Sequence, residues 1–247
     1  MTFQILELRN YLLKPNVPEH FIDYFEEHFI ATQEAVKMQV LGQFRLIGDP
    51  DHFVWLRGFS DMQTRLEGLQ SFYLGPVWKK YGPTANAMMI DSDNVLLLRS
   101  IGDTADLTCG SSAETVAAAL AAGTISPDTG VIAIDVYHAL PGKRDALIDQ
   151  FQKQIVPIYQ REEIQLRGCF VAEMSENTFP RLPVIQNEDD FVVITAYESE
   201  TACGEKREQV AVQTDQMISG VLKSPSDSLL LSPTLRSPIR YMSASQE

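Results

Sequence analysis

The segment Phe53–Tyr81 reads FVWLRGFSDMQTRLEGLQSFYLGPVWKKY and shows how this chain alternates between strand and helix. Its first seven residues are mostly apolar, as in a buried strand, but include Arg57. Ser60 is a good helix N-cap, and the apolar residues after it recur at helical spacing. Gly75-Pro76 ends this helix. We therefore predict a strand over 53–59, a helix from Ser60, and a cluster of large aromatic residues beyond it.

The chain on either side of this segment repeats one order of elements. Before it we predict a strand over 3–13, a helix over 18–37 and a strand over 40–47, and after it a strand over 95–99. The resulting βαββαβ order is that of a ferredoxin-like unit. The order returns in the second half of the chain, with strands predicted over 131–139, 165–173, 191–198 and 229–231 and helices over 143–161 and 201–222.

A direct comparison of the two halves supports an internal repeat. Residues 11–44 align with residues 137–170 without a gap when the sequence is shifted by 126 positions, and eight of the 34 pairs are identical. Ordinary residue frequencies give about two identities by chance. The identical pairs fall at matching places in the predicted elements, so we predict a tandem duplication.

The duplication predicts how the two units pack. A ferredoxin-like unit covers one face of its sheet with helices, and its bare apolar face needs a partner. We predict an α+β fold of two tandem units whose antiparallel sheets pack face to face as an α+β barrel, a pseudo-dimer. The units span residues 1–103 and 131–247. Residues 104–130 form a linker with a short Ala-rich helix, preceded by a capping box from Ser111 to Glu114.

Strand alternation assigns side chains to the two faces of each sheet. We expect the apolar residues Leu6, Leu8 and Leu12 to lie under the helices, together with their second-half counterparts Ile132, Ile134 and His138. The residues expected to line the barrel are Glu7, Arg9, Tyr11, Trp55, Arg57 and Phe59 in the first unit and Ala133, Asp135, Tyr137, Val193, Thr195 and Tyr197 in the second.

Composition excludes several classes of partner. The net charge is −13, and a cut at Gly123 divides it into −6 and −7, so the acidity is even and no basic patch is present. We expect no nucleic-acid partner and no membrane partner. The chain has no run of 18 apolar residues and no signal-peptide pattern. The three cysteines, Cys109, Cys169 and Cys203, are far apart, which favours a reducing, cytoplasmic location over disulfides or zinc.

Several of these residues together resemble a known family. The pattern Trp55-x-Arg57-Gly58-Phe59-x-Asp61-Met62-x-x-Arg65, followed by Phe72-Tyr73 and Trp78, resembles the NIPSNAP family of the dimeric α+β barrel superfamily. The likeness is clearest over residues 3–100 and weaker over 131–232, where Thr195-Ala196-Tyr197 replaces Arg57-Gly58-Phe59. The resemblance implies the fold. The family has no agreed reaction, so it assigns no catalytic residues, and the superfamily includes cofactor-free monooxygenases, haem-handling enzymes and ligand-binding proteins.

The charged and aromatic residues of the first unit are the candidate site. Arg9 and Arg57 either form structural ion pairs with Glu7 or Asp135, or bind a carboxylate, phenolate or enolate. The large aromatic residues either fill the core or form the walls of a pocket for a flat, apolar ligand. The candidate ligand-binding residues are Glu7, Arg9, Tyr11, Trp55, Arg57, Phe59, Tyr73 and Trp78.

We predict a protein that binds a small, flat, largely apolar and anionic molecule, with cofactor-independent oxygenase or isomerase chemistry as an extension. We expect no cofactor and no metal, because none of the four histidines has a second ligand at metal-site spacing. One alternative is a non-enzymatic interaction or scaffold protein, including a homo-oligomer. The other is a haem-binding barrel that uses His28 or His138.

Overall fold

The structure is a computed structural model that describes residues 3–102, 105–108 and 111–242. The first half contains β1 (Ile5–Leu13), α1 (Pro18–His28), α2 (Ile30–Glu34), β2 (Gln39–Leu46), β3 (Asp49–Phe59), α3 (Met62–Tyr73), α4 (Pro76–Met88), β4 (Met89–Asp91) and β5 (Val95–Ser100). Two short helices follow, α5 (Ala105–Thr108) and α6 (Ala113–Ala121). The second half contains β6 (Val131–His138), α7 (Arg144–Gln150), the π-helix η1 (Phe151–Ile155), α8 (Val156–Arg161), β7 (Gln165–Ala172), β8 (Asp190–Tyr197), α9 (Glu200–Ile218), the 3₁₀ turn η2 (Ser219–Val221) and β9 (Asp227–Pro233).

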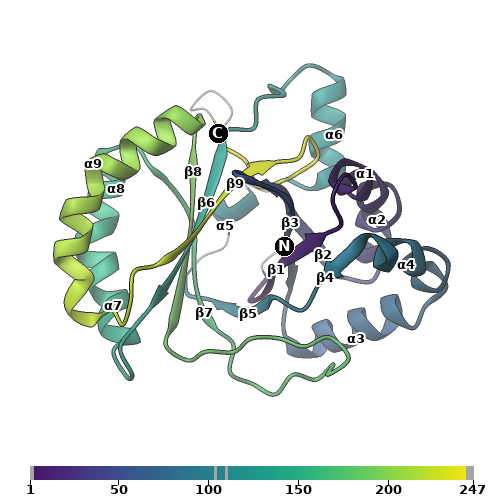
Figure 1. Ribbon diagram of the computed structural model, residues 1–247, viewed down its shortest axis with the longest axis horizontal. Coiled ribbons are helices and arrows are strands. Elements are labelled where there is room, and N and C mark those ends of the chain that lie inside the picture. The colour runs from purple at the N-terminus through teal and green to yellow at the C-terminus, as the bar shows by residue number, and fades with distance from the viewer. Residues whose placement is uncertain (1–2, 103–104, 109–110, 243–247) are drawn as a thin grey trace.

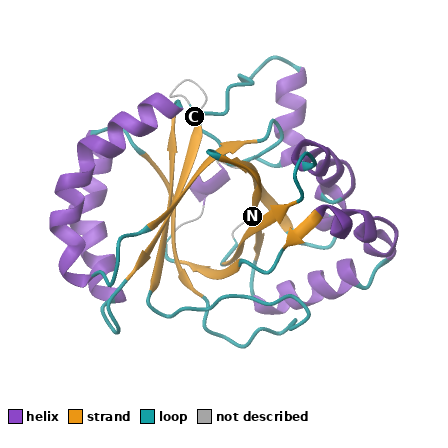
Figure 2. Cartoon of the chain, in the orientation of Figure 1, coloured by secondary structure: helices purple, strands orange, loops and turns teal. Residues whose placement is uncertain are grey.

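Both halves have the predicted βαββαβ order, and their strands close into one antiparallel barrel. The barrel order is β3-β2-β9-β6-β8-β7-β5-β1, and β1 pairs with β3 to complete the ring. The two sheets join at both edges, where Phe44 lies opposite Pro233 and Leu98 lies opposite Ala172. The α+β barrel fold is thereby confirmed. Helices α1–α4 cover the first sheet and α7–α9 cover the second, on opposite sides of the molecule (Figures 1 and 2).

The assignment of strand faces was wrong in the first unit and in the second. The barrel interior is filled by one apolar cluster from both halves, which includes Leu6, Leu8, Leu56, Ile132 and Ile134. The opposite face of each sheet lies under the helices and holds the residues that we expected inside the barrel. Strands β1, β6 and β8 have no exposed residue on either face, so alternation separates the faces without showing which one meets the helices.

Several element boundaries also differ from the prediction. The expected helix 18–37 is broken at Phe29 into α1 and α2. Helix α4 continues through Gly82-Pro83, with Pro83 inside the helix, so these two residues do not end it as predicted. The N-cap of α3 is Asp61 rather than Ser60, and the capping box of α6 joins Ser112 and Thr115, one residue later than predicted.

The loop between β7 and β8 belongs to the second half but crosses to the first. Phe179 and its neighbour Leu182 pack against the apolar cluster under α1–α4, and Ile185 forms a bridge with Leu96 of β5. This loop therefore helps to cover the candidate site.

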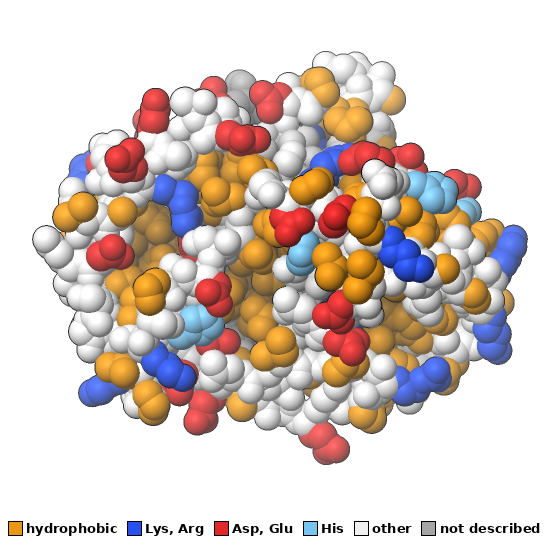
Figure 3. Space-filling view, in the orientation of Figure 1, with side chains coloured by type: hydrophobic (Ala, Val, Ile, Leu, Met, Phe, Trp, Pro, Cys, Tyr) orange, Lys and Arg blue, Asp and Glu red, His pale blue; other side chains and the backbone are white. Residues whose placement is uncertain are grey.

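The surface agrees with the even charge of the sequence, since acidic and basic side chains are interspersed over the face that Figure 3 shows. Within the described ranges, no helix combines the length and the hydrophobicity that a membrane crossing requires. Residue Cys109 lies outside the described residues, whereas Cys169 and Cys203 are free thiols.

Candidate functional site

Two neighbouring strands and one helix bring four charged side chains together under the helices of the first half. Glu7 and Arg57 lie directly opposite each other in the β1–β3 pairing, so their side chains share the face that meets α3. Helix α3 is capped by Asp61, whose carboxylate accepts a hydrogen bond of 2.6 Å from the Thr64 backbone N–H. This start places Arg65 on the buried side of the helix, facing β1.

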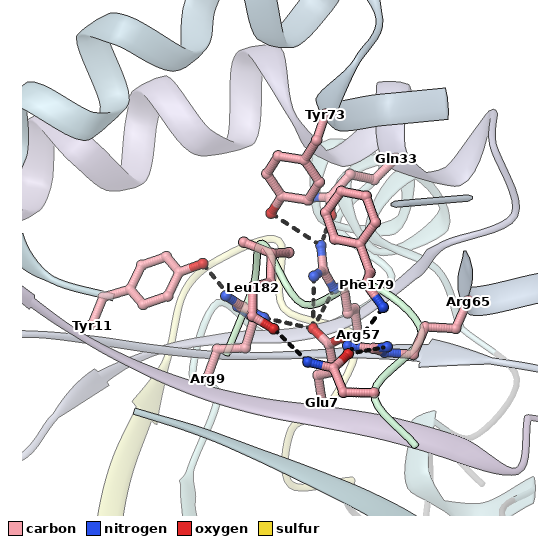
Figure 4. A network of polar contacts seen from close by, with 10 residues as sticks. Glu7, Arg9, Tyr11, Gln33, Arg57, Arg65, Tyr73, Phe179 and Leu182 are labelled. Carbon is pink, nitrogen blue, oxygen red and sulfur yellow. Dashed lines mark hydrogen bonds and ion pairs between the residues drawn. The ribbon is translucent and has the colours of Figure 1, made fainter. Parts of the chain in front are cut away.

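Glu7 is the centre of this cluster. Its Oε2 accepts hydrogen bonds from Arg9 Nη1 at 2.6 Å and from Arg57 Nε at 2.8 Å. Its Oε1 accepts a hydrogen bond of 2.7 Å from Arg65 Nε. We call Glu7, Arg9, Arg57 and Arg65 the arginine cluster (Figure 4). All four residues are 0–1% exposed, so water does not screen their charges.

A shell of neutral polar groups surrounds the arginine cluster. Arg9 Nε donates to the Tyr11 hydroxyl at 2.8 Å. Arg57 Nη1 donates to Gln33 Oε1 at 3.1 Å and to the Tyr73 hydroxyl at 3.3 Å. Arg65 Nη1 donates to Asn177 Oδ1 at 3.1 Å, and Asn177 belongs to the crossing β7–β8 loop. None of these partners carries a formal negative charge, so the shell orients the guanidiniums without neutralising them.

The arginine cluster carries an excess of positive charge. Burial alone would raise the pKa of Glu7, but the guanidiniums of Arg57, Arg9 and Arg65 outweigh it and hold that pKa far below its usual range. Glu7 is therefore ionised, and one carboxylate faces three guanidiniums, a formal charge of +2. In addition, Arg65 Nη2 and Trp55 Nε1 are buried without a hydrogen-bond partner among the described residues. The cluster thus has both charge and donors to offer.

A small aromatic cavity adjoins the arginine cluster. Its volume is about 20 Å³, and three of its lining residues, Tyr11, Gln33 and Tyr73, are the hydrogen-bond partners of Arg9 and Arg57. Trp55 and Trp78 form part of its wall, and the Tyr73 and Trp78 rings meet at 4.7 Å between centroids. A cavity of this size holds one group the size of a water molecule.

The structure brings together all eight predicted site residues. The Arg57 guanidinium carbon lies 5.2 Å from the centroid of the Trp55 ring and 5.7 Å from that of the Phe59 ring. The prediction that Asp135 could pair with Arg9 or Arg57 was wrong. Asp135 lies in the other half and binds Arg207 through two hydrogen bonds of 2.8 Å.

Sequence reasoning missed three members of the site, Gln33, Arg65 and Asn177. Arg65 had a usable signal, because it lies three residues after Met62 and four before Leu69 and so shares the apolar stripe of α3. A charged residue on such a stripe is buried and needs a partner. Gln33 and Asn177 had no comparable signal.

The two histidines of the haem alternative have partners of their own. The His28 ring stacks on Tyr81 with centroids 4.0 Å apart. His138 lies between two carboxylates, with Nδ1 at 2.7 Å from Asp190 and Nε2 at 3.1 Å from Asp227. In the part of the chain that the structure describes, no three His, Cys, Asp or Glu side chains are grouped as a metal site.

The closed eight-stranded barrel with helices on its outside defines an α+β barrel protein in which one chain supplies both halves. Residues 6–101 match the model of the NIPSNAP family, and we call this matched part of the chain the NIPSNAP domain. No curated protein matches the sequence.

Solved structures share the whole barrel. A protein from Lactobacillus acidophilus NCFM, provisionally described as a monooxygenase, has a TM-score of 0.59 and 11% identity and covers 94% of each chain. A Fusobacterium nucleatum protein with the same provisional description has a TM-score of 0.60 and 9% identity and covers 94% of this chain and 93% of its own. An anthrone oxidase-like protein has a TM-score of 0.58 and 10% identity, with 95% and 94% covered. At these identities the likeness concerns the fold alone.

Proposed function

We propose that the NIPSNAP domain binds a small, flat, largely apolar anion, with its negative group on the arginine cluster. The observation that carries this proposal is the ratio of charges: three buried guanidiniums share one carboxylate. Like charges repel strongly where water cannot screen them, and a buried charge without a counter-charge is costly. An anion beside Arg57 and Arg9 lowers the excess charge and removes this cost.

The surroundings of the cluster indicate the kind of anion. A guanidinium presents paired N–H groups that match a carboxylate and also suit a phenolate or an enolate. The rings of Trp55, Tyr73 and Trp78 offer flat apolar surfaces next to those N–H groups. An aromatic carboxylate or phenolate satisfies both features, whereas a strongly hydrated inorganic anion satisfies only the first.

The proposal requires the site to open when the ligand enters. The cavity of about 20 Å³ has room for a group the size of a water molecule, and so for neither a whole carboxylate nor an aromatic ring. Tyr73 and Trp78 are only half-buried, and the β7–β8 loop contacts Tyr73 through Phe179, with ring centroids 6.1 Å apart. We infer that entry of the ring displaces Trp78 and this loop.

Thermal unfolding with matched ligands tests the proposal. Benzoate and 2-naphthoate should raise the melting temperature of the wild-type protein at constant ionic strength through Arg57, whereas any shift with the neutral amides benzamide and 2-naphthamide should not depend on Arg57. Arg57→Met should abolish the effect. Arg45→Met is the control, because Arg45 forms a half-exposed pair with Glu19 outside the cluster and its loss should leave the effect unchanged.

No shift with the acids, or a full shift with the acids in Arg57→Met, would refute an anion site. The arginine cluster would then be a structural core, and the interaction or scaffold alternative would be the better account of the protein.

Oxygenase or isomerase chemistry without a cofactor is the second candidate. A phenolate or enolate that forms on a bound substrate would be stabilised by the preorganised guanidiniums of Arg9 and Arg57. The monooxygenase and oxidase-like descriptions of proteins with this barrel accord with such chemistry. This candidate depends on anion binding and adds to it the conversion of the ligand, which product analysis under oxygen with a binding phenol would reveal.

A further inference from the structure

A second and larger cavity lies in the other half of the chain, under α9. Its volume is about 300 Å³, at the lower end of the range usual for small-ligand pockets. Its lining includes the tyrosines Tyr137, Tyr159 and Tyr197 and the ion pair of Asp135 with Arg207. We call it the tyrosine pocket.

The tyrosine pocket occupies the place that corresponds to the first site. Strand β6 pairs with β8 as β1 pairs with β3: Tyr137 lies opposite Phe191 as Tyr11 lies opposite Phe53. In this register Ala133 takes the place of Glu7, Asp135 that of Arg9 and Thr195 that of Arg57. Counted from the helix N-caps Asp61 and Ser199, Cys203 takes the place of Arg65. None of the arginines of the first site is retained.

The charge of the tyrosine pocket differs accordingly. Arg207 is neutralised by Asp135, which accepts two hydrogen bonds of 2.8 Å from it and another from the Ser228 hydroxyl. Glu208 and Asp215, both exposed, add negative charge to the lining. An anion therefore meets repulsion here, in contrast to the excess positive charge of the arginine cluster.

The three phenols supply hydrogen bonds to a neutral ligand. The hydroxyls of Tyr137 and Tyr159 bond to each other, and Thr195 donates to the Tyr197 hydroxyl at 3.3 Å. Each bonded pair leaves a hydroxyl proton that can be donated further. Burial raises the pKa of all three tyrosines above its ordinary value of 10, so they are neutral phenols at physiological pH. Val210 and Ile218 complete an apolar wall.

We propose that the tyrosine pocket binds a neutral, flat molecule that carries hydroxyl or carbonyl oxygens, so that the two halves of this chain hold different ligands at corresponding positions. The rings and aliphatic side chains contact the faces of the ligand, and the phenols bond to its oxygens. This site is independent of the anion site proposed for the NIPSNAP domain.

Titration calorimetry with 2-naphthol, a neutral two-ring phenol, tests the proposal. The wild-type protein should bind 2-naphthol saturably with one site and naphthalene more weakly, and Arg57→Met, in which the anion site is disabled, should bind 2-naphthoate more weakly than 2-naphthol. Tyr159→Phe and Tyr197→Phe remove only a hydroxyl group and should each lower the affinity about threefold to tenfold. Ala211→Phe places a ring in the pocket and should abolish binding. Its neighbour Val212 is 66% exposed, so Val212→Phe is the matched control and should bind like the wild type.

The outcomes separate this proposal from the first one. Arg57→Met should bind 2-naphthol normally, because Arg57 belongs to the other site. Binding that is lost in Arg57→Met would place the ligand in the NIPSNAP domain and overturn the proposal. Binding that survives Ala211→Phe, or no saturable binding at millimolar 2-naphthol, would also overturn it.

Discussion

At the scale of single residues, Glu7 is the residue whose removal should affect the structure most. It accepts hydrogen bonds from Arg9, Arg57 and Arg65, and no solvent reaches any of the four. Removal of one arginine leaves Glu7 with two partners, so Arg57→Met does not create an unpaired carboxylate. Removal of Glu7 leaves three buried guanidiniums together. Loss of the carboxylate and loss of one guanidinium from these ion pairs should therefore have different effects on stability.

We predict that Glu7→Gln lowers the free energy of unfolding by about 3–5 kcal/mol, the cost of buried charge left without its counter-charge. Arg57→Met should change it much less, because it reduces an excess of positive charge. The double variant Glu7→Gln/Arg57→Met should be more stable than Glu7→Gln alone. Urea unfolding of the three variants measures these differences. A double variant that is less stable than Glu7→Gln would contradict the stated charge balance.

At the scale of elements, a histidine clamp joins three strands of the second half. His138 at the end of β6 lies between Asp190 of β8 and Asp227 of β9. Burial alone would lower the pKa of His138, but the hydrogen bonds to the two carboxylates outweigh it and raise the pKa above 6.5. A raised pKa in the folded state means that the protonated clamp stabilises the fold at low pH.

The raised pKa of His138 fixes the sign of the pH dependence of stability. The contribution of His138 should be complete below pH 6.5 and should be lost as the pH rises through the raised pKa. We expect the wild-type melting temperature to fall over this window relative to His138→Gln, which cannot titrate. Melting curves of both proteins from pH 5 to 9 test this. Parallel curves would show that His138 does not couple to folding.

The crossing β7–β8 loop and α4 form the cover of the anion site. Asn177 and Phe179 contact Arg65 and Tyr73 from the loop, and Trp78 contacts Tyr73 from the first turn of α4. Benzoate binding should therefore protect the backbone amides of residues 174–187 and 76–82 from hydrogen exchange and leave α9 unchanged. Protection spread evenly over both halves would instead indicate general stabilisation.

The sequence carried enough information for the elements but not for the orientation of the sheets. Periodicity and turn residues located each barrel strand to within a few residues, because strand and helix periods differ clearly. Neither face of β1 is exposed, so no pattern could show whether Leu6 or Glu7 faces the helices. The residues on strands could be grouped into one site because residues two apart share a face. Asn177 could not, since it lies on a loop that crosses from the other half.

At the scale of the whole molecule, the barrel core belongs to neither half alone. Leu8 and Leu56 from the first half pack in one cluster with Ile134 and Ile194 from the second. Each half also needs the other to pair its edge strands, at β2–β9 and β5–β7. The tandem arrangement thus does within one chain what two separate units would do as a dimer.

We predict that a fragment of residues 1–103 does not remain a folded monomer. Its barrel face, which includes Leu6, Leu8 and Leu56, would be exposed together with two unpaired strand edges. Light scattering coupled to gel filtration should show a dimer or larger species. A monomer with a cooperative melting transition would contradict the shared core.

The central claim is that the arginine cluster of the NIPSNAP domain binds an aromatic anion, and a crystal structure with 4-bromobenzoate tests it most directly. The account predicts a bromine anomalous peak among the rings of Trp55, Tyr73 and Trp78, with the carboxylate on Arg57 or Arg9. The peak should be absent from crystals of Arg57→Met grown in the same way. Bromine peaks only on the surface, with the cavity closed and unchanged, would contradict the claim.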